Sequence, residues 1–81
     1  MSTAQPSGRL RWHCRRGMRE LDVLLMGYLD RHYAHVPEAE QQAFERLLGL
    51  QDPEILGLLN GRIHAQDAAL NDVVQRLLAV S

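Results

Sequence analysis

The hydrophobic residues of this chain recur at helical spacing along most of its length. Between residues 18 and 35 they fall three or four positions apart and therefore share one face of a helix. That face consists of Leu21, Leu24, Leu25 and Tyr28, with His32 in line with them. No run of four or more residues alternates between apolar and polar side chains as a half-buried strand would. The pattern predicts an all-α domain.

Local signals divide the N-terminal half into a tail and two helices. Residues 1–7 are small and polar and are expected to form a flexible tail. Ser7 can cap a short first helix that runs to about residue 15, and Gly17 is a stop signal after it. The second helix is expected to run from Met18 to about His35.

Three more helices are predicted in the C-terminal half. Pro37 suits the first turn of a helix over roughly residues 38–50. Asp52 and Pro53 are typical of an N-cap followed by a first-turn proline, which predicts a short helix that ends near Gly61. Asp67 is expected to cap a last helix. The side chains expected to be buried in these helices are Ala43, Phe44, Leu47, Leu48, Ile55, Leu56, Leu58, Leu59, Leu70, Val73, Val74, Leu77 and Leu78.

The length and composition fit one small domain. Hydrophobic residues make up 46% of the 81 positions, but only 5% of the positions are aromatic. An aliphatic, leucine-rich core of this kind suits packed helices better than a sheet. We therefore expect a single helical domain over residues 8–81, built as a compact bundle of four or five helices joined by short loops.

Cysteine content and the N-terminal sequence bear on location. A lone cysteine, Cys14, excludes an intramolecular disulfide and is typical of a reducing compartment, so a cytoplasmic protein is expected. Residues 1–19 are rich in arginine and free of acids, as in a mitochondrial transit peptide, and the mitochondrial matrix is the alternative. No stretch reaches the roughly 18 consecutive apolar residues that a membrane span needs, so no membrane partner is expected.

Charge is distributed unevenly along the chain. The formal net charge is only −1, yet residues 1–19 carry five arginines and no acid, while residues 20–81 carry four arginines and ten acids. Basic charge gathered at one end of an otherwise acidic domain indicates an interaction surface.

The segment HCRRGMRE, residues 13–20, is the densest in chemically active side chains. Histidine and cysteine followed by arginine resemble a tyrosine-phosphatase loop, in which five residues must separate cysteine from arginine so that both surround a phosphate. Four residues separate Cys14 from Arg19, and the next position is Glu20, whose carboxylate would repel a phosphate. Nearby arginines can lower a thiol pKa, but Cys14 is expected to be a small, half-buried helix residue. No catalytic residue is assigned.

A metal site is not predicted. His32 and His35 are three positions apart and can meet on one helix face. No second pair of ligands has suitable spacing, and His64 stands alone in a loop. His32 is expected to be a hydrogen-bonded residue at the rim of the core.

Nucleic-acid binding is the alternative function that the composition leaves open. Arginines beside Trp12 can pair with phosphates and stack on a base. The acidic remainder of the domain would repel a polyanion, however, and the pI of about 6.4 is far below that of a typical nucleic-acid-binding domain. A nucleic-acid partner is therefore not expected.

A protein-docking surface is the third interpretation of the segment. Gly17 lies between two predicted helices, where a missing Cβ lets the backbone of a partner come close. Arg16 and Glu20 offer a donor and an acceptor for ion pairs, and Trp12 and Met18 offer apolar area. A purely structural alternative makes Gly17 a helix C-cap and Arg16–Glu20 a local pair at i, i+4 spacing. The physical chemistry alone leaves both open.

Arg16 to Glu20 read RGMRE, an RGxxE motif. Embedded in RLRWHCRRGMRELD, it closely resembles the succinate dehydrogenase FAD-assembly factor family, a set of small helical proteins of bacteria and mitochondria. The likeness continues through Tyr33, the F-x-x-L-L run that starts at Phe44, and Asp52-Pro53, and it covers roughly residues 9–80. The chain departs from the family at Leu58, where a tryptophan is usual.

The resemblance implies a five-helix bundle that is not an enzyme. It implies binding to the flavoprotein subunit of succinate dehydrogenase, and often of fumarate reductase, and promotion of the covalent attachment of FAD to a histidine of that subunit. No stably bound cofactor is expected, since the FAD belongs to the partner. By likeness, Arg16, Gly17 and Glu20 lie at the centre of the contact. The full set of expected partner-binding residues is Arg11, Trp12, Arg15, Arg16, Gly17, Met18, Arg19 and Glu20.

Overall fold

A computed structural model describes residues 8–80 of the chain, apart from the side chains of Arg9 and Val80. Its elements are α1 (Gly8–His13), α2 (Arg19–Arg31), the short 3-10 helix η1 (Tyr33–His35), α3 (Glu38–Leu48), α4 (Asp52–Asn60) and α5 (Ala68–Val80). No strand occurs between residues 8 and 80, and the predicted all-α bundle of five α-helices is confirmed. The predicted flexible tail and the cap at Ser7 lie outside the described residues.

The N-terminal helices are shorter than predicted. α1 ends at His13 rather than near residue 15. The predicted second helix divides into α2 and η1, because after Arg31 the backbone tightens and His35 N–H bonds to the carbonyl of His32. η1 ends at His35, because the next residue, Val36, precedes a proline and has an extended backbone, with φ −99° and ψ 160°.

The C-terminal helices begin and end close to their predicted bounds, with two corrections. Pro37 is the N-cap of α3 rather than a residue of its first turn. Asp52 is not the N-cap of α4; Gln51 occupies that position, and its N–H donates to the carboxylate of Glu54 at 3.0 Å. The signals at Gly61 and Asp67 are confirmed: Gly61 ends α4 with a left-handed φ of +85°, and Asp67 accepts a 2.7 Å hydrogen bond from Leu70 N–H at the start of α5.

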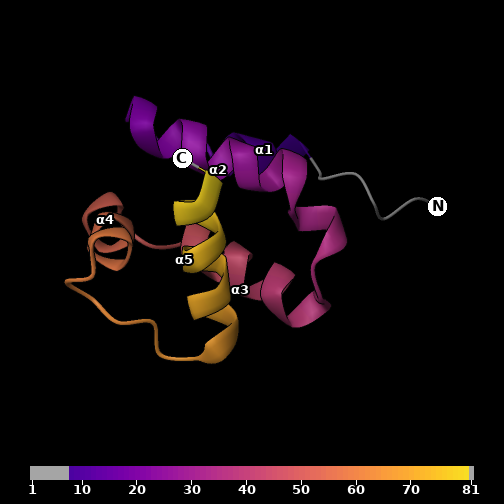
Figure 1. Ribbon diagram of the computed structural model, residues 1–81. Helices are drawn as coiled ribbons and strands as arrows, with labels where there is room; N and C mark the ends of the chain where they lie inside the picture. Colours follow the sequence, from indigo (N-terminus) through magenta and orange to yellow (C-terminus); the bar gives the residue numbers. More distant parts are fainter. Residues whose placement is uncertain (1–7, 81) are drawn as a thin grey trace.

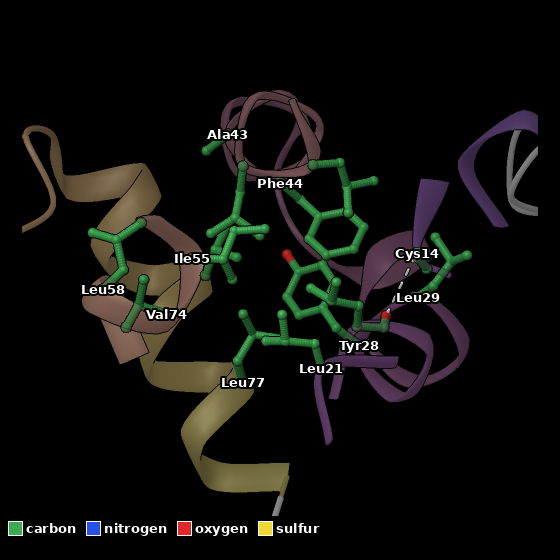
Figure 2. Close-up of a cluster of buried hydrophobic side chains, with 14 of the residues drawn as sticks. Cys14, Leu21, Tyr28, Leu29, Ala43, Phe44, Ile55, Leu58, Val74 and Leu77 are labelled. Carbon is green, nitrogen blue, oxygen red and sulfur yellow. Dashed lines mark hydrogen bonds between the residues drawn. The ribbon is translucent and has the colours of Figure 1, made fainter. Parts of the chain in front are cut away.

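The core lies where α5 contacts α2, α3 and α4 (Figure 1). At its centre the rings of Tyr28 and Phe44 stack with centroids 4.3 Å apart (Figure 2). Most of the predicted core residues are buried. Five residues predicted to be buried are less buried than expected. Leu24, Leu56, Leu59 and Leu70 are only partly buried, and Leu78 is 41% exposed.

One polar side chain is buried among these apolar residues. Glu40 is 3% exposed, and its Oε2 accepts hydrogen bonds from Tyr28 and Arg76. Burying a carboxylate is costly unless charged and polar donors surround it, and here both are supplied. This cluster joins α2, α3 and α5.

None of the helices within residues 8–80 combines the length and the apolar character that a bilayer-spanning helix requires.

Candidate protein-docking surface

The segment HCRRGMRE forms the corner between α1 and α2. Two contacts hold α1 and the residue after it to α2: the side chain of Arg11 pairs with Asp30 at 3.0 Å, and Cys14 is fully buried with its Sγ 3.8 Å from the carbonyl of Leu25. Leu10 also packs against the core. In Figure 1, α1 and α2 lie close together, and residues 14–18 connect them. The corner is therefore held against α2 by residues on its α1 side.

Cys14 differs from its prediction. It lies just after α1 and is fully buried rather than half-buried in a helix. Burial raises the pKa of its thiol to about 11, and the nearby guanidinium groups of Arg11 and Arg16 oppose this rise only in part. A thiol that keeps its proton and is closed off from solvent is a packing residue rather than a nucleophile.

Gly17 occupies the tip of the corner. Its φ is +84°, a left-handed conformation that glycine adopts without steric cost. It follows the end of α1 by four residues and precedes Met18, the N-cap residue of α2, so it is not the C-cap of α1. A Cβ added at Gly17 would meet nothing within 4 Å, and the residue is exposed. The space in front of its backbone is open.

Arg16 points inward instead of toward solvent. Its side chain is 16% exposed, and its Nε donates to Asp52 Oδ1 at 2.8 Å. The other guanidinium nitrogens donate to the carbonyls of Leu48, at 2.7 Å, and of Leu50. The guanidinium thus bonds to the junction between α3 and α4, and the alternative of a local Arg16–Glu20 pair is wrong.

The backbone of Arg16 is held as well. Its N–H donates to Asp22 Oδ1 in the first turn of α2 at 2.6 Å. The residue before Gly17 is thus held at its backbone by α2 and at its side chain by the α3–α4 junction. Neither aspartate was among the predicted site residues. Asp52 lies 36 positions from Arg16, and no local pattern signals a contact over that separation.

The remaining predicted residues face solvent to different degrees. Trp12 is 72% exposed, an unusual position for an indole ring, and Arg15, Arg19 and Glu20 are exposed. Met18 is partly buried against the core, which leaves only part of it for a partner. Arg11 is exposed too, but its side chain is paired with Asp30. We call the other exposed residues of the predicted set the docking surface; it consists of Trp12, Arg15, Gly17, Arg19 and Glu20.

The docking surface combines the groups that protein interfaces favour. An exposed aromatic ring supplies apolar area, while arginines and a glutamate supply charge-assisted hydrogen bonds. Glu20 also lies in the first turn of α2, where a carboxylate is favoured by the partial positive charge of the helix N-terminus. Across the part of the chain that the structure covers, no three histidine, cysteine or acidic side chains gather as a metal site would need. His32 is half-buried beside Tyr28, at the rim of the core.

Comparisons with known proteins agree with the family that the sequence resembles. A family model described as the flavinator of succinate dehydrogenase matches residues 8–81. A protein of Colwellia psychrerythraea is 46% identical over 70 residues, which cover 86% of this chain and 77% of that protein. A protein of Methylococcus capsulatus is 45% identical over 73 residues, covering 90% and 88% of the two chains. One of Vibrio cholerae is 34% identical over 79 residues, covering 98% and 92%. All three are named FAD assembly factor SdhE. No solved structure matches the chain at a significant level.

Proposed function

Because the chain belongs to the succinate dehydrogenase flavinator family, as an assembly factor rather than an enzyme, we propose how it acts: it docks on the flavoprotein subunit through the docking surface. The family match and the relatives support a role in the flavinylation of succinate dehydrogenase. The identity of the subunit and of the contacting residues is our proposal.

The bond-forming chemistry belongs to FAD and to the partner. Covalent attachment requires the flavin ring and a histidine of the flavoprotein subunit to be held in reactive geometry. A small protein accelerates such a step by binding the arrangement of the partner in which these groups already meet. This chain needs no nucleophile for that purpose, and Cys14 is buried with a raised pKa.

Each member of the docking surface has a distinct part in the proposed contact. Trp12 would cover apolar surface of the partner, and Arg15 and Arg19 would donate to its carboxylates or carbonyls. Glu20 would accept from a basic or amide group. Gly17, without a Cβ, would let a segment of the partner backbone lie directly against the corner.

One observation carries this proposal. Gly17 is exposed and has open space around it, and the residue before it, Arg16, is bonded both to α2 and to the α3–α4 junction. These bonds stabilise the fold at the α3–α4 junction, and they also hold the corner in one conformation before a partner arrives. A preorganised surface loses less conformational entropy on binding.

The test is co-expression with the flavoprotein subunit of succinate dehydrogenase, scored by flavin fluorescence of that subunit on a denaturing gel. Wild-type protein is expected to raise the fluorescent fraction, and Glu20→Ala to remove most of the increase. Arg62→Ala is the control, because Arg62 is an exposed charged residue of the α4–α5 loop. Equal flavinylation with Glu20→Ala and with wild type would remove Glu20 from the site.

The same proposal extends to fumarate reductase, whose flavoprotein subunit is the second expected partner, and to a cytoplasmic location, since the relatives compared above are bacterial. It also separates the chain from a nucleic-acid-binding protein. A small arginine patch should lose its hold on heparin or duplex DNA near 150 mM salt, whereas capture of the flavoprotein subunit should persist.

A further inference from the structure

Asp52 lies outside the docking surface but is bonded to Arg16, the residue that precedes Gly17 in the chain. Asp52 is the first residue of α4, and its carboxylate accepts from Arg16 Nε at 2.8 Å. The side chain of Asp52 is 30% exposed and that of Arg16 is 16% exposed, so this ion pair is partly shielded from water. The other ion pair of the corner, Arg11–Asp30, is far more exposed, at 46% and 53%. Shielding strengthens an ion pair and fixes its geometry.

An aspartate just before a proline is typical of a helix N-cap, but the carboxylate of Asp52 does not cap α4. Gln51 is the N-cap residue of α4, and Glu54 accepts its N–H. Asp52 is therefore free to face Arg16. The neighbouring carbonyls of Leu48 and Leu50 accept from the same guanidinium, so three acceptors of the α3–α4 junction converge on one side chain.

The carbonyls and the carboxylate do different work there. Leu48 is the last residue of α3, where backbone carbonyls lack helical partners and a guanidinium can satisfy them. Carbonyl oxygens carry no net charge, however. Among the described residues Asp52 is the acid in ion-pair contact with Arg16, so it is the acceptor there that carries a full negative charge.

We propose that Asp52 is a positioning residue for flavinylation. It does not touch the partner; it holds Arg16 against the α3–α4 junction, and so fixes the backbone at Gly17 in the conformation that docks. The inference rests on the proposed function, since Asp52 would act on the same docking surface indirectly, through its bond to Arg16. Without Asp52, Arg16 would sample other conformers, and apparent affinity falls in proportion to the population of the competent one.

The first measurement uses the isolated protein. Asp52→Ala is expected to speed amide hydrogen exchange at Arg16, whose N–H is bonded to Asp22, by about tenfold, since local opening sets exchange. Asp67→Ala is the matched control. Asp67 also pairs with an arginine, Arg46 at 3.1 Å, and it caps α5, so its loss destabilises the domain without releasing the corner.

The second measurement is affinity for the flavoprotein subunit, taken at a temperature where every variant is folded. Asp52→Ala is expected to weaken binding about tenfold, and Asp52→Asn, which keeps an oxygen for Arg16 Nε, by less. Asp67→Ala should bind within about twofold of wild type. If Asp52→Ala leaves exchange at Arg16 unchanged, or weakens binding no more than Asp67→Ala does, Asp52 has no positioning role.

The two proposals fail in different ways. If wild-type protein neither binds the flavoprotein subunit nor raises its flavinylation, the proposed function is wrong, whatever the exchange data show. If wild type binds and Asp52→Ala binds equally well, only the inference about Asp52 is wrong.

Discussion

The hydroxyl of Tyr28 donates a 2.8 Å hydrogen bond to Oε2 of Glu40, a carboxylate that is only 3% exposed. Arg76 Nε donates to the same oxygen at 2.7 Å. Burial and the neighbouring carboxylate raise the pKa of the Tyr28 hydroxyl, because both disfavour its ionised form. The three side chains come from α2, α3 and α5, so one carboxylate oxygen links three of the helices that form the core.

Tyr28→Phe should lower the free energy of unfolding by about 1–2 kcal/mol, because it takes a donor from a buried carboxylate and leaves the ring stacked on Phe44. Tyr33→Phe is the matched control. Tyr33 also donates to a glutamate, Glu45 at 2.6 Å, but Glu45 is exposed and water can replace the lost donor. Urea unfolding of both variants measures the difference. Equal losses would show that burial of Glu40 adds nothing to the bond.

Gly57 is covered by the side chain of Ile63, which folds back over α4. A Cβ at Gly57 would lie 2.6 Å from Ile63 Cδ1, and Ile63 N–H bonds to the carbonyl of Gly57 at 3.0 Å. Gly57→Ala should therefore destabilise the domain by up to about 1 kcal/mol, because Ile63, which is 44% exposed, must rotate away from α4 and lose its packing there. In an Ile63→Ala background the clash is gone, and the same change should stabilise it by up to about 1 kcal/mol, because alanine is the better helix former.

Thermal or urea unfolding of the four proteins in this cycle gives the two effects of Gly57→Ala. A change of sign between the backgrounds is the expected result. The same destabilisation in both would mean that a contact other than Ile63 requires the glycine.

Cys14 should be inert in the folded protein. With a pKa near 11 and no exposed surface, its thiol should react with a thiol reagent at pH 8 only at the rate at which the domain opens. Adding urea beyond the unfolding midpoint should bring the rate to that of a free cysteine. Cys14→Ala should keep flavinylation within a factor of a few, since no step uses the sulfur. Loss of flavinylation by a folded Cys14→Ala protein would contradict the docking mechanism.

The helices could be predicted because their signals are local. The periodic leucines of α2 and α5, Gly61 after α4 and the cap at Asp67 each act within one or two turns of their own position. The roles of Asp52 and Glu40 could not be predicted in the same way. A carboxylate near a helix start suits the helix dipole wherever the helix lies, and only the packing of distant elements places Asp52 against Arg16 and Glu40 against Tyr28.

The same limit applies to the candidate site, whose residues stay a prediction: the sequence places them close together in the chain but does not show where each side chain points. The RGxxE motif lies in the corner between α1 and α2. Gly17 and Glu20 are exposed there, which a residue that contacts a partner requires. Arg16 belongs to the same five-residue motif but turns inward. Spacing along the chain cannot distinguish a guanidinium that meets a partner from one that supports the backbone next to it. The direct contact predicted for Arg16 stays a prediction, and its bonds to the α3–α4 junction indicate a supporting role.

Gly17 has two features that a substitution would affect, and the chain offers a way to separate them. Its backbone is left-handed, with φ +84°, and the space around it is open. Gly17→Ala should therefore cost stability through backbone strain alone, about 1–2 kcal/mol, because no neighbouring atom obstructs the new methyl group. If a partner backbone lies in that space, the methyl group meets it directly, and affinity should fall by a further tenfold or more.

Gly61 is the control for this prediction because it matches Gly17 in conformation and surroundings. Its φ is +85°, it is exposed, and a Cβ there would also meet nothing within 4 Å. Gly61→Ala should thus lower the melting temperature by a similar amount. It lies between α4 and α5, outside the docking surface, and should leave capture of the flavoprotein subunit intact. Thermal melts and pull-downs of both variants with wild type make the comparison. If the two variants lose stability and capture to the same extent, Gly17 serves only the turn, and the docking surface must be sought elsewhere on the domain.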